Sequence, residues 1–114
     1  MKTIISIDVQ AKEWFDKVNG NSYFSGTIHV NYLDGEQRIF FMPFQYGYGD
    51  YYLQETYKRL NEHNVISGGF AEFTTLRKYC NENNIELNAI IQKDCKKSEL
   101  KQIEKDYNNS LELI

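Results

Sequence analysis

The chain has 114 residues, a formal net charge of −3 and 41% hydrophobic residues. This composition excludes a disordered chain, and no apolar run reaches the roughly 18 residues that a membrane span needs. The length fits one domain, which we place at residues 1–114. The N-terminal residues lack the apolar stretch of a secretory signal, so we expect a cytoplasmic protein.

The first half of the chain predicts three strands. Hydrophobic and polar residues alternate over 3–9, which indicates a half-buried strand. The alternation blurs over 10–18, where the strand can continue through a bulge. Two more strands, over 23–32 and 37–44, flank Asp34-Gly35, a dipeptide typical of a two-residue hairpin turn.

A two-residue turn determines which side chains of the hairpin share a face. Val30 then faces Ile39 and Ile28 faces Phe41, and we expect this aliphatic face to be core. The other face mixes polar and aromatic groups. Its pairs are His29–Phe40, Thr27–Met42, Ser25–Phe44 and Tyr23–Tyr46.

The second half of the chain predicts three helices and one strand. Asp50 and Ser98 are suitable N-caps for the first and third helices. Alternation over 85–91 indicates the strand. The apolar residues of the three helices are, in chain order, Leu53, Tyr57 and Leu60; Phe70, Phe73, Leu76 and Cys80; and Leu100, Ile103, Tyr107 and Leu111.

The resulting order of elements is β-β-β-α-α-β-α, which is typical of the α+β class. We expect a three-stranded antiparallel meander plus a fourth strand. Two to three helices should pack on one face of this sheet, and that face should be the aliphatic one.

The chain offers little catalytic or metal-binding chemistry. His29, His63, Cys80 and Cys95 are far apart in sequence, whereas a zinc site needs about four clustered ligands. Isolated cysteines in a reducing compartment are most often buried. No nucleophile elbow, paired-carboxylate motif or HExxH is present. We therefore expect no metal, no cofactor and no enzymatic activity.

The aromatic content is high, with nine Tyr, seven Phe and one Trp. Most of these residues lie between Trp14 and Tyr57, and one helical layer cannot cover them all. We expect Trp14, Phe15, Phe41 and Tyr57 to be core. The remaining large aromatics predict an exposed patch for a partner, a ligand or a second copy of the chain. The predicted partner-binding residues are Tyr23, Phe40, Phe44, Tyr46, Tyr48 and Tyr51.

A lysine stripe marks the last helix. Lys97, Lys101 and Lys105 recur at every fourth position, and such a stripe can contact phosphates. Glu99 and Glu104 are interleaved with it, which is more typical of a solvated helix face with local ion pairs. The mildly acidic net charge also makes nucleic acid the less expected partner.

Two segments carry a resemblance to known sequences. Residues 12–24 read KEWFDKVNGNSYF, and residues 43–50 read PFQYGYGD. They resemble small uncharacterised accessory proteins of bacteriophages and prophages from gut and Gram-positive bacteria. The resemblance covers about the first 65 residues and brings no established activity with it. It implies a phage protein acting in the bacterial cytoplasm. Phage proteins of this size often block a host machine, including defence systems of the anti-CRISPR kind.

Two hypotheses follow from the sequence. The first is a non-enzymatic protein that docks on a bacterial host protein or nucleoprotein through the aromatic patch. The alternative is a nucleotide or single-stranded nucleic-acid binder, in which aromatics stack on bases and the lysine stripe contacts phosphates. A homodimer formed through the same patch also remains open.

Overall fold

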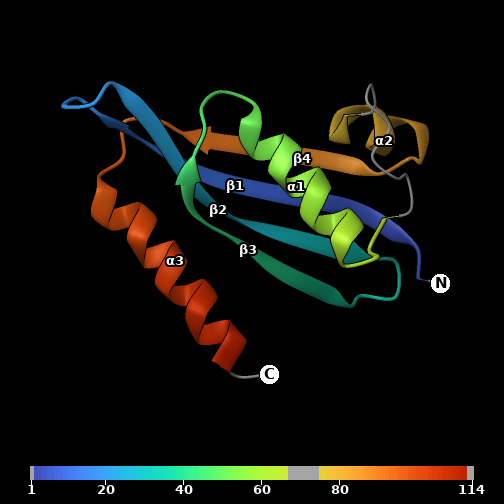
Figure 1. Ribbon diagram of the computed structural model, residues 1–114. Helices are drawn as coiled ribbons and strands as arrows, with labels where there is room; N and C mark the ends of the chain where they lie inside the picture. The colour runs from blue at the N-terminus through green and yellow to red at the C-terminus, as the bar shows by residue number, and fades with distance from the viewer. Residues whose placement is uncertain (1, 67–74, 113–114) are drawn as a thin grey trace.

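The computed structural model describes residues 2–66 and 75–112 (Figure 1). Four strands and three helices follow the predicted order. The strands are β1 (Ile4–Asp16), β2 (Asn21–Tyr32), β3 (Gln37–Tyr46) and β4 (Glu86–Gln92). The helices are α1 (Tyr51–Glu62), α2 (Leu76–Glu82) and α3 (Lys97–Glu112). The α+β class and the β-β-β-α-α-β-α order are therefore confirmed.

The strands form one mixed sheet in the order β3-β2-β1-β4. β1, β2 and β3 make the expected antiparallel meander, and β4 pairs in parallel with the free edge of β1. β1 keeps one register from Ser6 to Asp16, so there is no bulge between Ala11 and Trp14. Its one register shift lies at its start, between Ile4 and Ser6.

The β1–β2 turn is held by the carboxylate at the end of β1. Asp16 accepts hydrogen bonds from the backbone N–H groups of Val18 and Asn19 and from the Asn19 side chain. The Asn19 side chain is the main cause that lowers the pKa of Asp16 below its ordinary value.

The β2–β3 turn differs from the predicted two-residue hairpin. The backbone N–H of Tyr32 donates to the carbonyl of Glu36, so three residues, 33–35, form the loop. Gly35 has φ +89°, and Asp34 is absent from the described non-glycine residues with positive φ. A two-residue type I′ turn needs positive φ at both central positions, whereas a three-residue loop needs it only at its last.

The longer loop shifts the register of the hairpin by one residue. Ile28 faces Phe40 and His29 faces Ile39, so the predicted pairs Val30–Ile39 and Ile28–Phe41 are wrong. A shift of one residue moves each side chain to the opposite face. Ile39 is consequently 49% exposed, and Phe40 packs against the core.

A bulge on β3 restores the predicted register farther along the hairpin. Gly26 faces Met42 and Phe24 faces Gln45, so two residues of β3, Pro43 and Phe44, lie opposite a single residue of β2. Proline has no N–H to donate to a ladder, and bulges are among the few places where a strand tolerates it. Beyond the bulge, Tyr23 faces Tyr46 as predicted.

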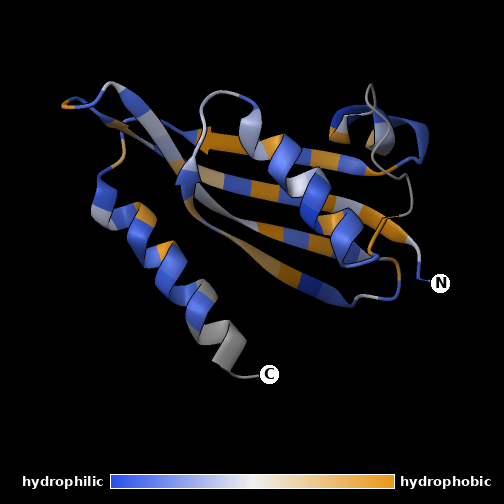
Figure 2. Cartoon of the chain, viewed as in Figure 1, coloured by the Kyte–Doolittle hydropathy of each residue, from blue (hydrophilic) through white to orange (hydrophobic). Residues whose placement is uncertain are grey.

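The aliphatic face of the sheet forms the core with α1 and α2. Figure 2 shows hydrophobic and hydrophilic residues alternating along the strands, as expected for a sheet with one buried face. Leu53, Tyr57 and Leu60 of α1 are buried against this face, as predicted. Of the predicted second-helix residues, Leu76 and Cys80 are also buried, whereas Phe70 and Phe73 lie outside the described residues. The buried strand residues are Ile7, Val9, Ala11, Phe24, Ile28, Val30 and Met42.

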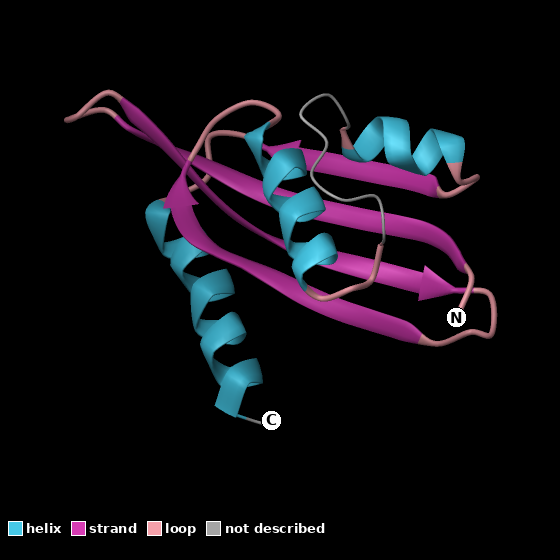
Figure 3. Cartoon of the chain, turned by 45° about the vertical axis from the view of Figure 1, so that its right-hand side comes forward, coloured by secondary structure: helices cyan, strands magenta, loops and turns pink. Residues whose placement is uncertain are grey.

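The third helix packs against the other face. The buried hydroxyl of Ser25, which points away from α1, donates to the carbonyl of Leu100 in α3. Figures 1 and 3 both place α3 at the opposite end of the sheet from α2. Two helices therefore cover the aliphatic face as expected, and the third covers part of the polar and aromatic face.

The start of α3 also differs from the prediction. The helix begins at Lys97, so Ser98 is inside it and is not its N-cap. The carboxylate of Glu99 instead accepts the backbone N–H of Lys96, as the glutamate of a capping box does. This hydrogen bond is the main cause that lowers the pKa of Glu99.

Gly26 allows the close approach of neighbouring strands. A Cβ added there would lie 2.6 Å from the carbonyl oxygen of Gln10 and 2.9 Å from the Cε of Met42. The methionine end can move, but the backbone oxygen belongs to the β1–β2 ladder. We expect Gly26→Ala to lower the free energy of unfolding by about 1–3 kcal/mol, the usual cost of overpacking.

Urea denaturation of Gly26→Ala, followed by far-UV circular dichroism, measures this loss. Thr27→Ala is the matched control, because Thr27 is the next residue of β2 and is only half-buried. An unchanged denaturation midpoint for Gly26→Ala would contradict the close contact with Gln10.

The buried thiol of Cys80 makes stability depend on alkaline pH. Burial raises its pKa from 9.0 to about 11. Between these values the unfolded chain loses the thiol proton while the folded chain keeps it, so stability falls as pH rises. The expected loss between pH 9 and 11 is about 2–3 kcal/mol.

Denaturation curves for the wild type and Cys80→Ala measure this contribution across that pH range. The variant should be less stable at pH 7 because it leaves a cavity, yet its stability should decline less above pH 9. Cys95→Ser is the control and should retain most of the decline. Parallel pH profiles for the wild type and Cys80→Ala would refute the assignment.

Candidate binding surface

Three rings contact one another on the face that α3 partly covers. We call Trp14, Tyr23 and Phe44 the aromatic ladder; they come from β1, β2 and β3. Ring centroids are 5.7 Å apart for Trp14–Tyr23, 5.1 Å for Tyr23–Phe44 and 6.3 Å for Trp14–Phe44. Such separations are those of favourable aromatic pairs, so the ladder fastens three strands together.

Two lysines of the predicted stripe lie over two rings of this ladder, Trp14 and Phe44. The Nζ of Lys97 is 5.4 Å from the centroid of Trp14, and that of Lys101 is 4.3 Å from the centroid of Phe44. Lys101 also pairs with Glu104 at 3.2 Å. Each cation–π contact at a partly exposed site is worth about 0.5–1 kcal/mol, so the lysines help to hold α3 on the ladder. Lys105 is exposed.

The ladder continues into a depression that we call the tyrosine pocket. The ring of Tyr46 meets that of Tyr23 edge-on, with centroids 5.9 Å apart. The pocket has a volume of about 500 Å³. Its three rings are well exposed: Tyr46 by 58%, Tyr48 by 68% and Tyr51 by 42%. The residues that line it are Tyr46, Gly47, Tyr48, Asp50, Tyr51 and Gln54.

The backbone of the pocket is fixed by a close approach at Gly47. A Cβ there would lie 2.6 Å from a ring carbon of Phe24 and 2.7 Å from a ring carbon of Tyr51. The N–H of Gly47 donates to the carbonyl of Ser22, which ties the loop to β2. Tyr51 in turn packs edge-on against the buried Phe24, with centroids 5.8 Å apart. The pocket therefore rests on the core.

Asp50 supplies the only formal charge among the residues that line the tyrosine pocket. It precedes α1 at the N-cap position, yet its side chain makes no capping hydrogen bond. It also makes no ion pair with any described residue. The pocket thus combines three phenol rings with one carboxylate that the helix does not use.

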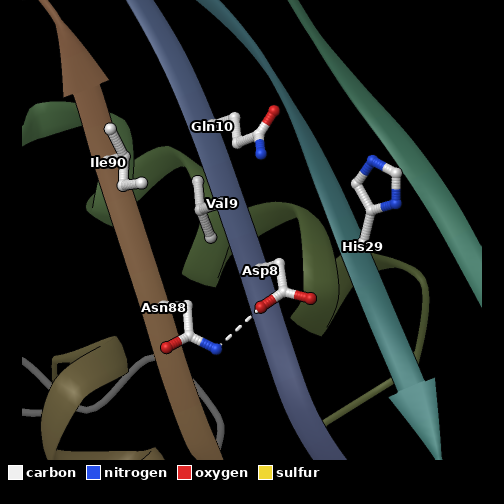
Figure 4. A pocket seen from close by; sticks show the side chains of 6 residues that line it. All are labelled: Asp8, Val9, Gln10, His29, Asn88 and Ile90. Carbon is white, nitrogen blue, oxygen red and sulfur yellow. Dashed lines mark hydrogen bonds between the residues drawn. The ribbon is translucent and has the colours of Figure 1, made fainter.

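A second, smaller depression of about 230 Å³ lies on the uncovered part of the sheet face. Its lining residues, drawn in Figure 4, are Asp8, Val9, Gln10, His29, Asn88 and Ile90. Asp8 accepts hydrogen bonds from Asn88 at 2.8 Å and from Asn31 at 2.9 Å. Asn31 also accepts one from Gln37 at 2.7 Å, which completes a polar row across all four strands. This row joins the strands, and we assign it a structural role.

The structure brings together most of the predicted partner-binding residues. Tyr23 and Phe44 belong to the ladder, and the predicted residues Tyr46, Tyr48 and Tyr51 line the pocket. The prediction that Phe40 belongs to this surface is wrong. It lies on the core face, 5.0 Å from the ring of His63 and under the guanidinium of Arg38.

Three residues, Trp14, Phe15 and Asp50, differ from what the sequence predicts. Trp14 was expected in the core but is half-buried in the ladder, and Phe15, also expected in the core, is exposed. Asp50 was expected only as a helix cap. The sequence held a signal for its place in the pocket, because Asp50 directly follows Tyr46-Gly47-Tyr48-Gly49.

Comparison with protein-family models, with curated proteins and with solved structures finds no match for this chain. Among residues 2–66 and 75–112, no three His, Cys, Asp or Glu side chains gather as a metal site would require. No helix within the same ranges has both the length and the apolar character to span a bilayer.

The ladder predicts a specific response to loss of Tyr23. Tyr23→Ala removes the ring that stacks on both Trp14 and Phe44, so we expect a loss of about 2 kcal/mol in unfolding free energy. The emission of Trp14, the one tryptophan of the chain, should also shift to the red as water reaches it. Fluorescence-detected urea denaturation measures both effects.

Lys105→Ala is the control for this experiment, because Lys105 is an exposed residue of α3 and, unlike Lys97 and Lys101, lies over none of the three rings. It should alter stability by less than about 0.5 kcal/mol. Unshifted Trp14 emission in Tyr23→Ala would show that the ladder does not shield the indole.

Proposed function

We propose that this chain is a small non-enzymatic binding protein that docks on a bacterial host protein or nucleoprotein through the tyrosine pocket. The observation that carries the proposal is the exposure of Tyr46, Tyr48 and Tyr51 around one depression. Tyrosine offers a large rigid contact area with a polar tip, and it is enriched among the residues that dominate binding energy at protein interfaces.

The rigidity of the pocket supports this role. The ring of Tyr51 packs against that of Phe24. Gly47 is hydrogen-bonded to Ser22 and packs against the rings of Tyr51 and Phe24. A surface that is already ordered loses little conformational entropy on binding, so more of the contact energy becomes affinity. The pocket is therefore better suited to docking than a flexible loop with the same residues.

The resemblance to phage accessory proteins supports the partner class that we propose. One of its two segments, Pro43–Asp50, contains the β3 bulge and supplies most of the pocket. The proposed setting is the cytoplasm of a bacterial host, with inhibition of a defence system of the anti-CRISPR kind as one activity of such docking. This step is an argument from context.

The alternative nucleic-acid function has weaker support. Lys97 and Lys101 do lie beside aromatic rings, as a binder of single strands would need. However, both lysines already contact Trp14 and Phe44, and those rings stack on Tyr23 instead of standing free for bases.

The test begins by crosslinking the chain to its partner in host cells and identifying the partner by mass spectrometry. Calorimetry with the purified partner then compares the wild type with Tyr46→Ala and Tyr48→Ala. We expect each variant to weaken binding by about 30-fold or more, the effect of losing a residue worth 2 kcal/mol.

Leu33→Ala is the control, because Leu33 is an exposed apolar residue in the β2–β3 turn, away from the pocket. It should bind as the wild type does. Equal affinity in all variants would refute docking through the pocket. Salt-dependent oligonucleotide binding lost in Lys97→Ala and Lys101→Ala would favour the alternative function.

A further inference from the structure

This chain repeatedly places a cation over an aromatic ring. Four such contacts join side chains of the described residues, with cation-to-centroid distances between 4.3 and 5.8 Å. They are Lys2 over Tyr32, Arg38 over Phe40, Lys97 over Trp14 and Lys101 over Phe44. A lysine or arginine therefore covers each of these four rings.

The tyrosine pocket differs from these four sites. Within residues 2–66 and 75–112, no lysine or arginine lies over Tyr46, Tyr48 or Tyr51. Tyr46 and Tyr51 use their rings for edge-on contacts with Tyr23 and Phe24. Three electron-rich rings therefore line a space over which no cation of the described residues lies.

The carboxylate of Asp50 gives this space a negative charge. It makes no cap hydrogen bond and no ion pair with a described residue, so its charge is available to a ligand. Aromatic rings combined with a carboxylate are the elements of sites that recognise organic cations. An anion is disfavoured here by the same carboxylate.

The size and geometry of the pocket favour arginine over a small free cation. A volume of about 500 Å³ accommodates a whole side chain with part of its backbone. A guanidinium can stack on a tyrosine face and donate two parallel hydrogen bonds to one carboxylate, whereas an ammonium offers a point charge. The pocket offers partners for both interactions: the tyrosine rings for stacking and the Asp50 carboxylate for the two hydrogen bonds.

The net charge of the chain also favours a positively charged ligand. The chain carries a net charge of −3, with 16 acidic residues against 13 Lys and Arg. Complementary charge speeds association and orients the partner. A basic segment is therefore the more suitable occupant.

We propose that the tyrosine pocket binds an arginine side chain from a basic segment of the partner protein. The guanidinium stacks on Tyr46, Tyr48 and Tyr51 and pairs with Asp50. This inference rests on the proposed docking function and names the group that the docking surface recognises.

The test titrates the full chain, labelled with ¹³C in its tyrosine rings, with N-acetyl-arginine methylamide. Ring correlation spectra should show saturable shifts of Tyr46, Tyr48 and Tyr51, with a dissociation constant in the millimolar range. The citrulline analogue has nearly the same shape without the charge and should cause no saturable shift. The lysine analogue should bind more weakly than the arginine analogue.

Asp50→Asn removes the charge of the pocket with little change in shape. It should weaken binding of the arginine analogue by about tenfold, the effect of losing one charge-assisted contact. Asp34→Asn is the matched control, because it removes the same charge in the β2–β3 turn. It should leave the affinity unchanged. Equal shifts from the citrulline analogue, no saturation, or full affinity in Asp50→Asn would each overturn the inference.

This experiment separates the inference from the proposed function. In one outcome the chain binds the arginine analogue, but Tyr46→Ala and Tyr48→Ala bind the partner as tightly as the wild type does. This result would support the cation site and refute docking of the partner through the pocket. In the other outcome those variants lose affinity for the partner, but the wild type does not respond to the arginine analogue. This result would support docking through the pocket and refute arginine as the group that it binds.

Discussion

The position of the aromatic surface depends on one irregularity of the sheet, the bulge that sets Pro43 and Phe44 opposite Ser25. Even-numbered residues of β3 before the bulge face the core, as the buried Met42 shows. Without the extra residue, Phe44 and Tyr46 would continue on that face beneath α1. The bulge turns both rings to the opposite face, where they meet Tyr23. Because bulges re-aim side chains while the strand continues, one fold builds an aliphatic core and an aromatic surface from the same strand.

The elements and their order could be predicted because they depend on local periodicity, but the register could not. Asp34-Gly35 suits both a two-residue and a three-residue loop, since each needs a residue such as glycine at positive φ. The choice between them shifts every pair of the hairpin, and it places Phe40 beside His63 on the core face. The prediction for Tyr23 and Tyr46 was correct only because the bulge cancels that shift.

The aromatic residues and the lysine stripe were predicted from separate sequence patterns, and the fold brings them into contact. Lys97 and Trp14 are far apart in sequence, and nothing in the pattern of α3 indicates which face of the sheet the helix covers. That choice depends on long-range contacts, which include the hydrogen bond from Ser25 to Leu100 and the contacts of Lys97 and Lys101 with the ladder. The place of Asp50 in the pocket was missed for a different reason. Aspartate before a helix predicts a cap, and only the geometry shows that the cap hydrogen bond is not made.

The parallel pairing of β1 with β4 has a consequence for how the chain folds during synthesis. Asp8 and Asn88, which hydrogen-bond across this pair, are 80 residues apart. The meander can form once β3 has been made, but one edge of β1 then stays unpaired until the last quarter of the chain leaves the ribosome. Non-local pairings of this kind are slow, and open strand edges invite association with other chains. The nascent protein is therefore most prone to mispairing in the interval between completion of β3 and arrival of β4.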